Sequence, residues 1–128
     1  MKTKFSINWL SSIQPRKQRK YRFNAALHTK GKFLSARLSK ELTEKHKTRN
    51  ARVRSGDKVL IMRGQFKSVI GLVERVDLSR ERINVAGATL SKKDGSKVAY
   101  PIHPSNVQIT SLVEDKKRFK TEVKEAKK

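Results

Sequence analysis

Residues 53–77 read VRSGDKVLIMRGQFKSVIGLVERVD, a stretch in which Val, Ile and Leu are frequent and turn-forming residues interrupt them. This pattern is typical of short β-strands joined by tight turns. Similar runs continue toward the C-terminus, and together they predict five strands, at residues 58–62, 69–76, 82–85, 98–102 and 107–109. We expect this small sheet to close into a barrel, because an open sheet leaves unpaired edges and buries too little surface.

Gly71 lies inside the second of these runs and supports closure. Glycine within a strand usually marks a bulge, a bend at a barrel corner or the close approach of another backbone. We therefore predict that Gly71→Val disrupts the barrel through a steric conflict.

The charge of the chain limits the classes of partner. Its 128 residues contain 32 Lys and Arg against 11 Asp and Glu, a formal net charge of +21. A charge this large repels itself unless a polyanion neutralises it, which makes nucleic acid the first partner to consider. A membrane is disfavoured, because we find no run of about 20 apolar residues and no basic helix with a clean apolar face. We expect a soluble protein without a signal peptide, and the lack of cysteine fits a reducing compartment.

Basic and acidic residues are unevenly distributed along the chain. Residues 1–50 hold 14 Lys or Arg and 2 Asp or Glu, residues 51–113 hold 11 and 5, and residues 114–128 hold 7 and 4. We interpret these parts as a basic N-terminal extension, the barrel and a charged C-terminal tail. The extension is nearly devoid of strand-like alternation, so we expect it to stay extended or loosely helical until an anion orders it. The tail, with few apolar residues, is expected to be a solvated helix or disordered.

One or two short helices are predicted within the extension. The run from Ser35, SARLSKELTEKHKT, together with the residue before it, places Leu34, Leu38 and Leu42 four apart, as on one helical face. Ser39 is a suitable N-cap, and the sequence predicts a helix near residues 39–47. Residues 25–33 are expected to form another turn or two, weakened by a glycine within the segment.

The opening stretch resembles a KOW motif. The motif's elements are an apolar-flanked Gly-Asp strand start, a glycine turn, a lysine and a glycine in the next strand. Here they correspond to Gly56-Asp57-Lys58-Val59, Arg63-Gly64, Phe66-Lys67 and Gly71. Ser68 departs from the pattern, because the glycine usual after the lysine is missing, and this leaves the turn conformation in doubt. KOW motifs occur in ribosomal proteins and in transcription elongation factors alike.

The flanking segments decide between these two classes. They read QPRKQRK (14–20), FNAALH (23–28), LSARLSKEL (34–42) and YPIHPSNVQIT (100–110). In order and spacing they resemble the archaeal and eukaryotic form of the universal large-subunit ribosomal protein number twenty-four, from about residue 14 to 120. The resemblance implies an SH3-like barrel and cytoplasmic localisation in the large ribosomal subunit. It also implies binding to the 5′ region of the large ribosomal RNA, an early role in subunit assembly and a place near the peptide exit tunnel.

The alternative is a KOW-type nucleic-acid or RNA-polymerase binding module of a transcription elongation factor. Such a module is expected to be a discrete barrel within a larger, less basic protein. The cationic N-terminal extension argues against this alternative. Residues 1–13 precede the usual start of the ribosomal family, and Phe5, Ile7 and Trp9 alternate there at period two, which suits an added strand or stacking on bases as well as a frayed tail.

Candidate RNA-binding residues follow from charge and position. A dense cationic run near residue 20 can displace condensed counterions from RNA, and Tyr21 and Phe23 within it can stack on bases, although packing against the barrel is slightly favoured for Phe23. Cations at predicted strand ends and turns can reach phosphates without disturbing the core, although solvation is as good an explanation for any one of them. The complete set is Arg16, Lys17, Arg19, Lys20, Tyr21, Arg22, Arg52, Arg54, Lys58, Arg63, Lys67, Lys92, Lys93, Lys97 and His103.

No catalytic or metal site is predicted. His28, His46 and His103 lack metal-ligand spacing, and His103 beside Pro104 is better explained as a turn residue or an RNA hydrogen-bonder. The chain has no P-loop, GxGxxG or nucleophile elbow. We therefore expect a non-enzyme with no cofactor and no small-molecule substrate, whose partners are large-subunit ribosomal RNA and neighbouring ribosomal proteins. Phe66 in a turn is either a stacking platform or an aromatic folded over the barrel end.

Overall fold

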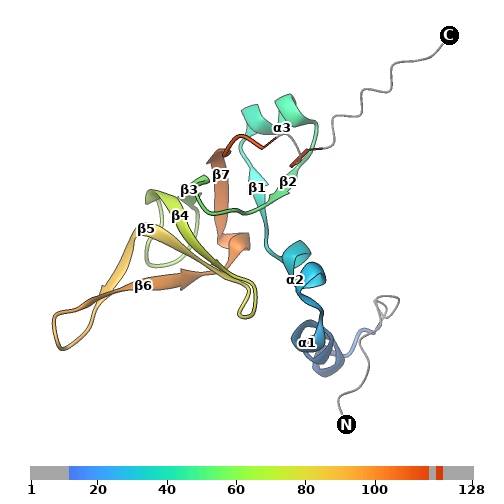
Figure 1. Cartoon of the computed structure of the whole chain (residues 1–128), viewed down its shortest axis with the longest axis horizontal. Helices are drawn as coiled ribbons and strands as arrows, with labels where there is room; N and C mark the ends of the chain where they lie inside the picture. The colour runs from blue at the N-terminus through green and yellow to red at the C-terminus, as the bar shows by residue number, and fades with distance from the viewer. Residues whose placement is uncertain (1–11, 116–117, 120–128) are drawn as a thin grey trace.

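The computed structural model describes residues 12–115, 118 and 119 and consists mainly of one sheet preceded by helices (Figure 1). The N-terminal part contains three short helices and two short strands. In chain order they are α1 (Pro15–Asn24), α2 (Leu27–Phe33), β1 (Ser35–Leu38), α3 (Lys40–His46) and β2 (Asn50–Arg52). The remaining elements are β3 (Lys58–Ile61), β4 (Ile70–Asp77), β5 (Arg82–Ser91), β6 (Lys97–Ile102), the 3-10 turn η1 (Pro104–Asn106) and β7 (Val107–Ser111).

All seven strands belong to one sheet, in the order β2-β1-β7-β3-β4-β5-β6. Strands β1 and β7 are parallel, with Arg37 opposite Gln108, and every other pairing is antiparallel. Register shifts between β4 and β5 and between β5 and β6 bend the sheet sharply, since an extra residue on one strand increases local twist. The β5–β6 hairpin consequently projects to one side of the molecule, while α1 and α2 lead away on another (Figure 1).

The core lies inside this bend. Alternate residues of the strands are buried, as a sheet with one covered face requires. The least exposed side chains include Leu34, Leu38, Ile61, Ile83 and Ile109, each no more than 1% exposed. Burying a side chain of this size contributes about 1.5–3 kcal/mol to folding, so the bent sheet holds most of the fold's apolar stabilisation.

The five predicted strands are all present, and the small barrel-like class is confirmed. The prediction of full closure is wrong, because β2 and β6 remain as edges of the hydrogen-bonded sheet in the described part of the chain. The physical reason is that β1 pairs in parallel with β7 and β2 then pairs with β1, so that the free side of β7 is covered by two more strands. The three-residue length of β2 keeps this edge short.

Strand β1 also corrects the interpretation of the leucine spacing. Leu34, Ala36 and Leu38 alternate into the core at period two, whereas Leu42 lies on α3 and packs against the core from there. A spacing of four fits both a helix and a strand, so the leucines were wrongly placed on one helical face. The helix predicted near residues 39–47 is confirmed as α3, and the Ser39 hydroxyl accepts a hydrogen bond from the Leu42 amide at 3.4 Å.

Gly71 shows one of the three features that its place inside a strand predicted, the close approach of another backbone. A Cβ atom at this position would lie 2.2 Å from the carbonyl oxygen of Ala86 on the neighbouring strand β5. Ser68 adopts the left-handed backbone that a glycine would favour, with φ of 71°. Its amide donates to the Ile61 carbonyl at 2.8 Å, so the turn keeps its shape with serine in place of the usual glycine.

Arg118 returns from the C-terminal part of the chain to the start of β3. Its guanidinium donates to both oxygens of the buried Asp57 carboxylate, at 2.7 and 2.6 Å, and to the Arg52 carbonyl at 2.7 Å. Asp57 also accepts from the backbone amides of Arg54 and Val113. Phe119 stacks on His46, with ring centroids 4.1 Å apart. The prediction of a solvated or disordered tail is therefore wrong at Arg118 and Phe119. Arg118 is held because the buried Asp57 carboxylate requires a partner of opposite charge.

Candidate RNA interface

Helix α1 carries the densest group of candidate residues. It contains no acidic residue in its first turn and no buried residue along its length. The cations at positions 16, 17, 19, 20 and 22 are all exposed. Because residues three and four apart are neighbours on a helix, Arg16 lies beside Arg19 and Lys20, and like charges in this arrangement are destabilising. An anionic partner would remove that repulsion.

An ion pair and contacts between rings and cations hold α1 against the rest of the protein. Arg22 forms an ion pair with Glu81 in the β4–β5 turn. The same guanidinium lies over the Phe33 ring, 5.3 Å from its centroid, and Tyr21 meets Phe33 edge-on at 6.4 Å. Helix α1 therefore has a defined position although it buries no side chain.

The two aromatic residues of this segment differ from expectation. Phe23, which we favoured as packed against the barrel, is 81% exposed and has the Lys30 ammonium 5.9 Å from its ring centroid. Tyr21 is half-buried through its contact with Phe33. The apolar residues that follow Phe23 misled the assignment, since Ala25 turns inward where the helix ends.

Two of the candidate cations on the sheet are engaged within the protein. Arg54 forms an ion pair with Asp115. The Arg52 guanidinium lies so close to Gly31 of α2 that a Cβ there would be 2.6 Å from it. Arg54 is thus paired within the protein and Arg52 packs beside α2, although both stay exposed to solvent.

The remaining Lys and Arg residues of the candidate set are exposed and form no ion pair in the part of the chain that the structure describes. Lys58 begins β3, and Arg63 and Lys67 flank the β3–β4 turn. Lys92, Lys93 and Lys97 surround the tip of the β5–β6 hairpin. The acid within this tip, Asp94, bonds to the amide and hydroxyl of Ser96 at 3.0 and 2.7 Å, and these hydrogen bonds lower its pKa. The tip lysines are therefore left to face solvent.

His103 caps the η1 turn rather than facing a metal. Its Nδ1 accepts from the Ser105 amide at 3.2 Å, so the neutral ring carries its proton on Nε2. Partial burial lowers the pKa of His103, and the charges of Arg82 and Arg22 lower it further, while Glu81 acts in the opposite direction. Among the described residues we find no group of three His, Asp or Glu side chains placed to hold a metal ion. Nor is any described helix long and apolar enough to cross a membrane.

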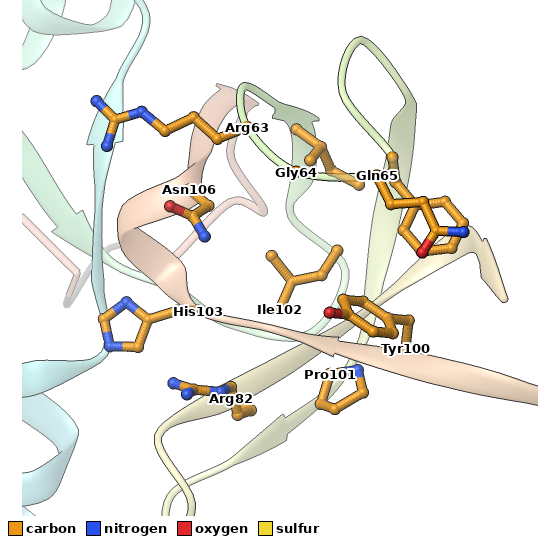
Figure 2. A pocket seen from close by; sticks show the side chains of 11 residues that line it. Arg63, Gly64, Gln65, Arg82, Tyr100, Pro101, Ile102, His103 and Asn106 are labelled. Atoms are coloured by element: carbon orange, nitrogen blue, oxygen red, sulfur yellow. The ribbon is translucent and has the colours of Figure 1, made fainter. Parts of the chain in front are cut away.

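The structure brings Arg63 and His103 together around one cavity (Figure 2). Phe66, Tyr100, Arg82 and other residues complete its lining. Sequence reasoning missed Arg82, Tyr100 and Asn106 as members of this site. Tyr100 and Asn106 belong to the segment YPIHPSN (100–106), whose mixture of aromatic, imidazole and amide groups was the available signal. Arg82 had no such signal, because a lone arginine at the start of a strand is common.

Comparison with known families agrees with this architecture. Residues 12–123 match the family that comprises the eukaryotic ribosomal proteins L26 and their archaeal L24 counterparts. The match spans the three helices, the whole sheet and the residues that pair with Asp57. The chain therefore belongs to this family of ribosomal proteins, and it is a structural component of the large subunit of the cytoplasmic ribosome.

Proposed function

We propose that the protein is a non-catalytic RNA-binding component that contacts the 5′ region of the large-subunit ribosomal RNA, supports early assembly of the subunit and lies near the peptide exit tunnel. The observation that carries this proposal is the exposed cationic surface of α1, beside a sheet whose own cations project from turns. Neighbouring ribosomal proteins complete its surroundings. Family membership supports the assignment to the ribosome.

Electrostatics explains how such a surface binds RNA. Each phosphate that a Lys or Arg neutralises releases condensed counterions, so the affinity falls with salt by a slope of about 0.7–0.9 per contact in log K against log salt. The bent sheet supplies a rigid shape, and the turn cations fix its orientation on the RNA backbone. The proposed contacts comprise α1, the β3–β4 turn, the β5–β6 hairpin and His103.

The first test is a salt titration of binding to transcripts of separate ribosomal RNA domains. We expect the 5′ transcript to bind most tightly. When Arg16, Lys17, Arg19 and Lys20 are changed to Gln, the slope of log K against log salt concentration should become shallower by up to about 3. The matched control changes Arg37, Lys40, Lys45 and Arg49 to Gln, which removes the same charge from exposed positions outside the proposed surface. Equal losses in both variants, or preference for another transcript, would overturn the proposed contact.

The place near the exit tunnel can be tested by site-specific crosslinking. Because the chain contains no cysteine, single cysteines at Ile13, Lys47 and Lys93 would each be unique attachment points for a crosslinker. In ribosomes that carry a stalled nascent peptide, we expect at least one of the three to form a crosslink to that peptide. Failure of all three, with crosslinks to ribosomal RNA intact, would remove the tunnel from the proposal and leave RNA binding standing.

A further inference from the structure

A small cavity opens between the β3–β4 turn and the segment that joins β6 to η1. Its volume is about 220 Å³, and its floor contains Ile61 and Ile102, which are 1% and 5% exposed. Figure 2 shows Ile102 in the middle of the lining, with Tyr100 on one side and with His103 and Arg82 on the other. The volume is below the roughly 300–1,000 Å³ of sites for drug-sized ligands, so the cavity suits one small ring system.

The Tyr100 side of the cavity is aromatic. Phe66 and Tyr100 approach with ring centroids 5.4 Å apart and planes tilted by 48°. Phe66 packs against the hydrophobic core, which fixes its position, while Tyr100 is 38% exposed. Of the two alternatives raised for Phe66, packing over the barrel end is confirmed, and the same ring also forms part of the wall of this cavity. An aromatic wall open on one face is suited to stacking by a flat heterocycle.

The opposite side is rich in hydrogen-bond donors and positive charge. Arg82 and Arg63 line the cavity together with His103, and no acidic residue takes part in the lining. Since Nδ1 of His103 accepts from Ser105, its Nε2 is a donor. Glu81 in the β4–β5 turn, the acid whose charge acts on His103, is already engaged by Arg22. The Asn106 amide adds a donor and an acceptor at the rim (Figure 2).

We propose that this cavity binds one unpaired nucleotide of the RNA, with its base against Tyr100 and Phe66 and its phosphate beside Arg82 and His103. The inference rests on the proposed RNA-binding function and adds a site for single-stranded recognition to a surface otherwise suited to phosphates. Aromatic stacking accepts any base, whereas the cations select a group that carries a phosphate. A duplex cannot enter, because its bases are stacked and paired.

The test uses the full chain and a single-stranded uridine decamer that contains 4-thiouridine. After irradiation, mass spectrometry should find the RNA adduct on the peptides that carry Phe66 or Tyr100. A duplex with the same thiouridine strand should give little labelling of these peptides. Labelling confined to α1, or equal labelling by the duplex, would overturn the inference.

Substitutions then test the two sides of the cavity separately. Tyr100→Leu should weaken decamer binding about 5- to 150-fold, while Tyr100→Phe should retain it, because stacking needs the ring. The control for exposure is Leu90→Ala, on the neighbouring strand at 40% exposure. Arg82→Gln should weaken the decamer more than Arg75→Gln, which removes one positive charge from β4 outside the cavity. The inference would be overturned if Tyr100→Leu weakened binding no more than Leu90→Ala does, and Arg82→Gln no more than Arg75→Gln, with the melting temperatures unchanged.

Further measurements distinguish failure of the cavity assignment from failure of the proposed function, and RNA binding from the binding of free nucleotides. If the 5′ ribosomal RNA transcript binds but the decamer labels neither Phe66 nor Tyr100, only the cavity assignment fails. If the cavity is labelled but no ribosomal RNA transcript binds, the proposed ribosomal RNA contact fails instead. Uridine monophosphate should not displace the decamer at equal concentration; displacement would show a free-nucleotide site and overturn the assignment to RNA.

Discussion

Helix α1 and the sheet of strands β3 to β7 are held in place by opposite means. The helix buries none of its ten residues and is anchored by one ion pair and by ring contacts with Phe33. Every strand of the sheet places at least one nearly inaccessible side chain in the core. Shape and charge are therefore separable in this protein: the sheet is stable through burial, and the helix presents cations whose mutual repulsion a polyanion would relieve.

The strongest way to break this contrast is to damage the sheet at its closest backbone approach. Gly71→Val should lower the free energy of unfolding by about 3 kcal/mol or more, because even a Cβ would lie 2.2 Å from the Ala86 carbonyl oxygen. Chemical denaturation measures the loss. Leu72→Val is the control, since Leu72 is the next residue of β4 and is 53% exposed. An unaltered Gly71→Val variant would contradict the described packing of β4 on β5.

The second prediction concerns the ion pair that fastens the chain after β7 to the sheet. Arg118→Met should cost about 3 kcal/mol of unfolding free energy, because it leaves the Asp57 carboxylate buried and unpaired. Adding Asp57→Asn should recover part of this loss, as a double-mutant cycle can show. If Arg118→Met leaves the unfolding free energy unchanged, the ion pair does not contribute to the stability of the sheet.

A smaller effect should come from the turn at Ser68. Ser68→Gly is expected to raise the unfolding free energy by about 0.5–1 kcal/mol, because glycine adopts a φ of 71° without the strain that a side chain imposes there. Ser79 also lies in a turn but does not have a positive φ, so Ser79→Gly should leave the unfolding free energy unchanged or lower it. Thermal unfolding of the two variants side by side would show whether the sign reverses.

The smallest global effect is expected at the anchor of α1. Arg22→Gln should change the unfolding free energy by less than about 1 kcal/mol, since the Arg22 side chain is 46% exposed. Hydrogen exchange of the α1 amides should nevertheless become faster, because the helix loses its link to Glu81. Arg16→Gln should have the opposite effect on exchange, since it removes a repulsive neighbour of Arg19 and Lys20. Exchange that is unchanged in both variants would show that α1 is held by other contacts.

Local pattern predicted much of the fold. The strand runs after residue 53, their turns and the helix capped by Ser39 were all recognisable, because each depends on residues within a few positions of one another. Gly71 was recognisable as an unusual strand residue, but its neighbour Ala86 on β5 was not. The leucines at 34 and 38 were misassigned, because their spacing fits a strand as well as a helix. Only their alternation with Ala36 into the core distinguishes the two.

The candidate site was less predictable, because contacts between distant residues determine which cations remain available. Arg22 reaches a partner 59 positions away and Arg54 one 61 positions away, and neither pairing has a local signal. Phe23 and Tyr21 were difficult to distinguish for the same reason, since the position of Phe33 relative to α1 decides which ring is covered.

Composition and short-range periodicity are enough to predict the class of the protein, a small β-rich fold with a surplus of positive charge. Three features follow from the folded arrangement alone: β1 extends the sheet beside β7, Asp57 pairs with Arg118, and one cavity is lined by Tyr100, Phe66, Arg82 and His103. Burial and ion pairing depend on which segments fold against one another, and short-range periodicity does not specify those partners.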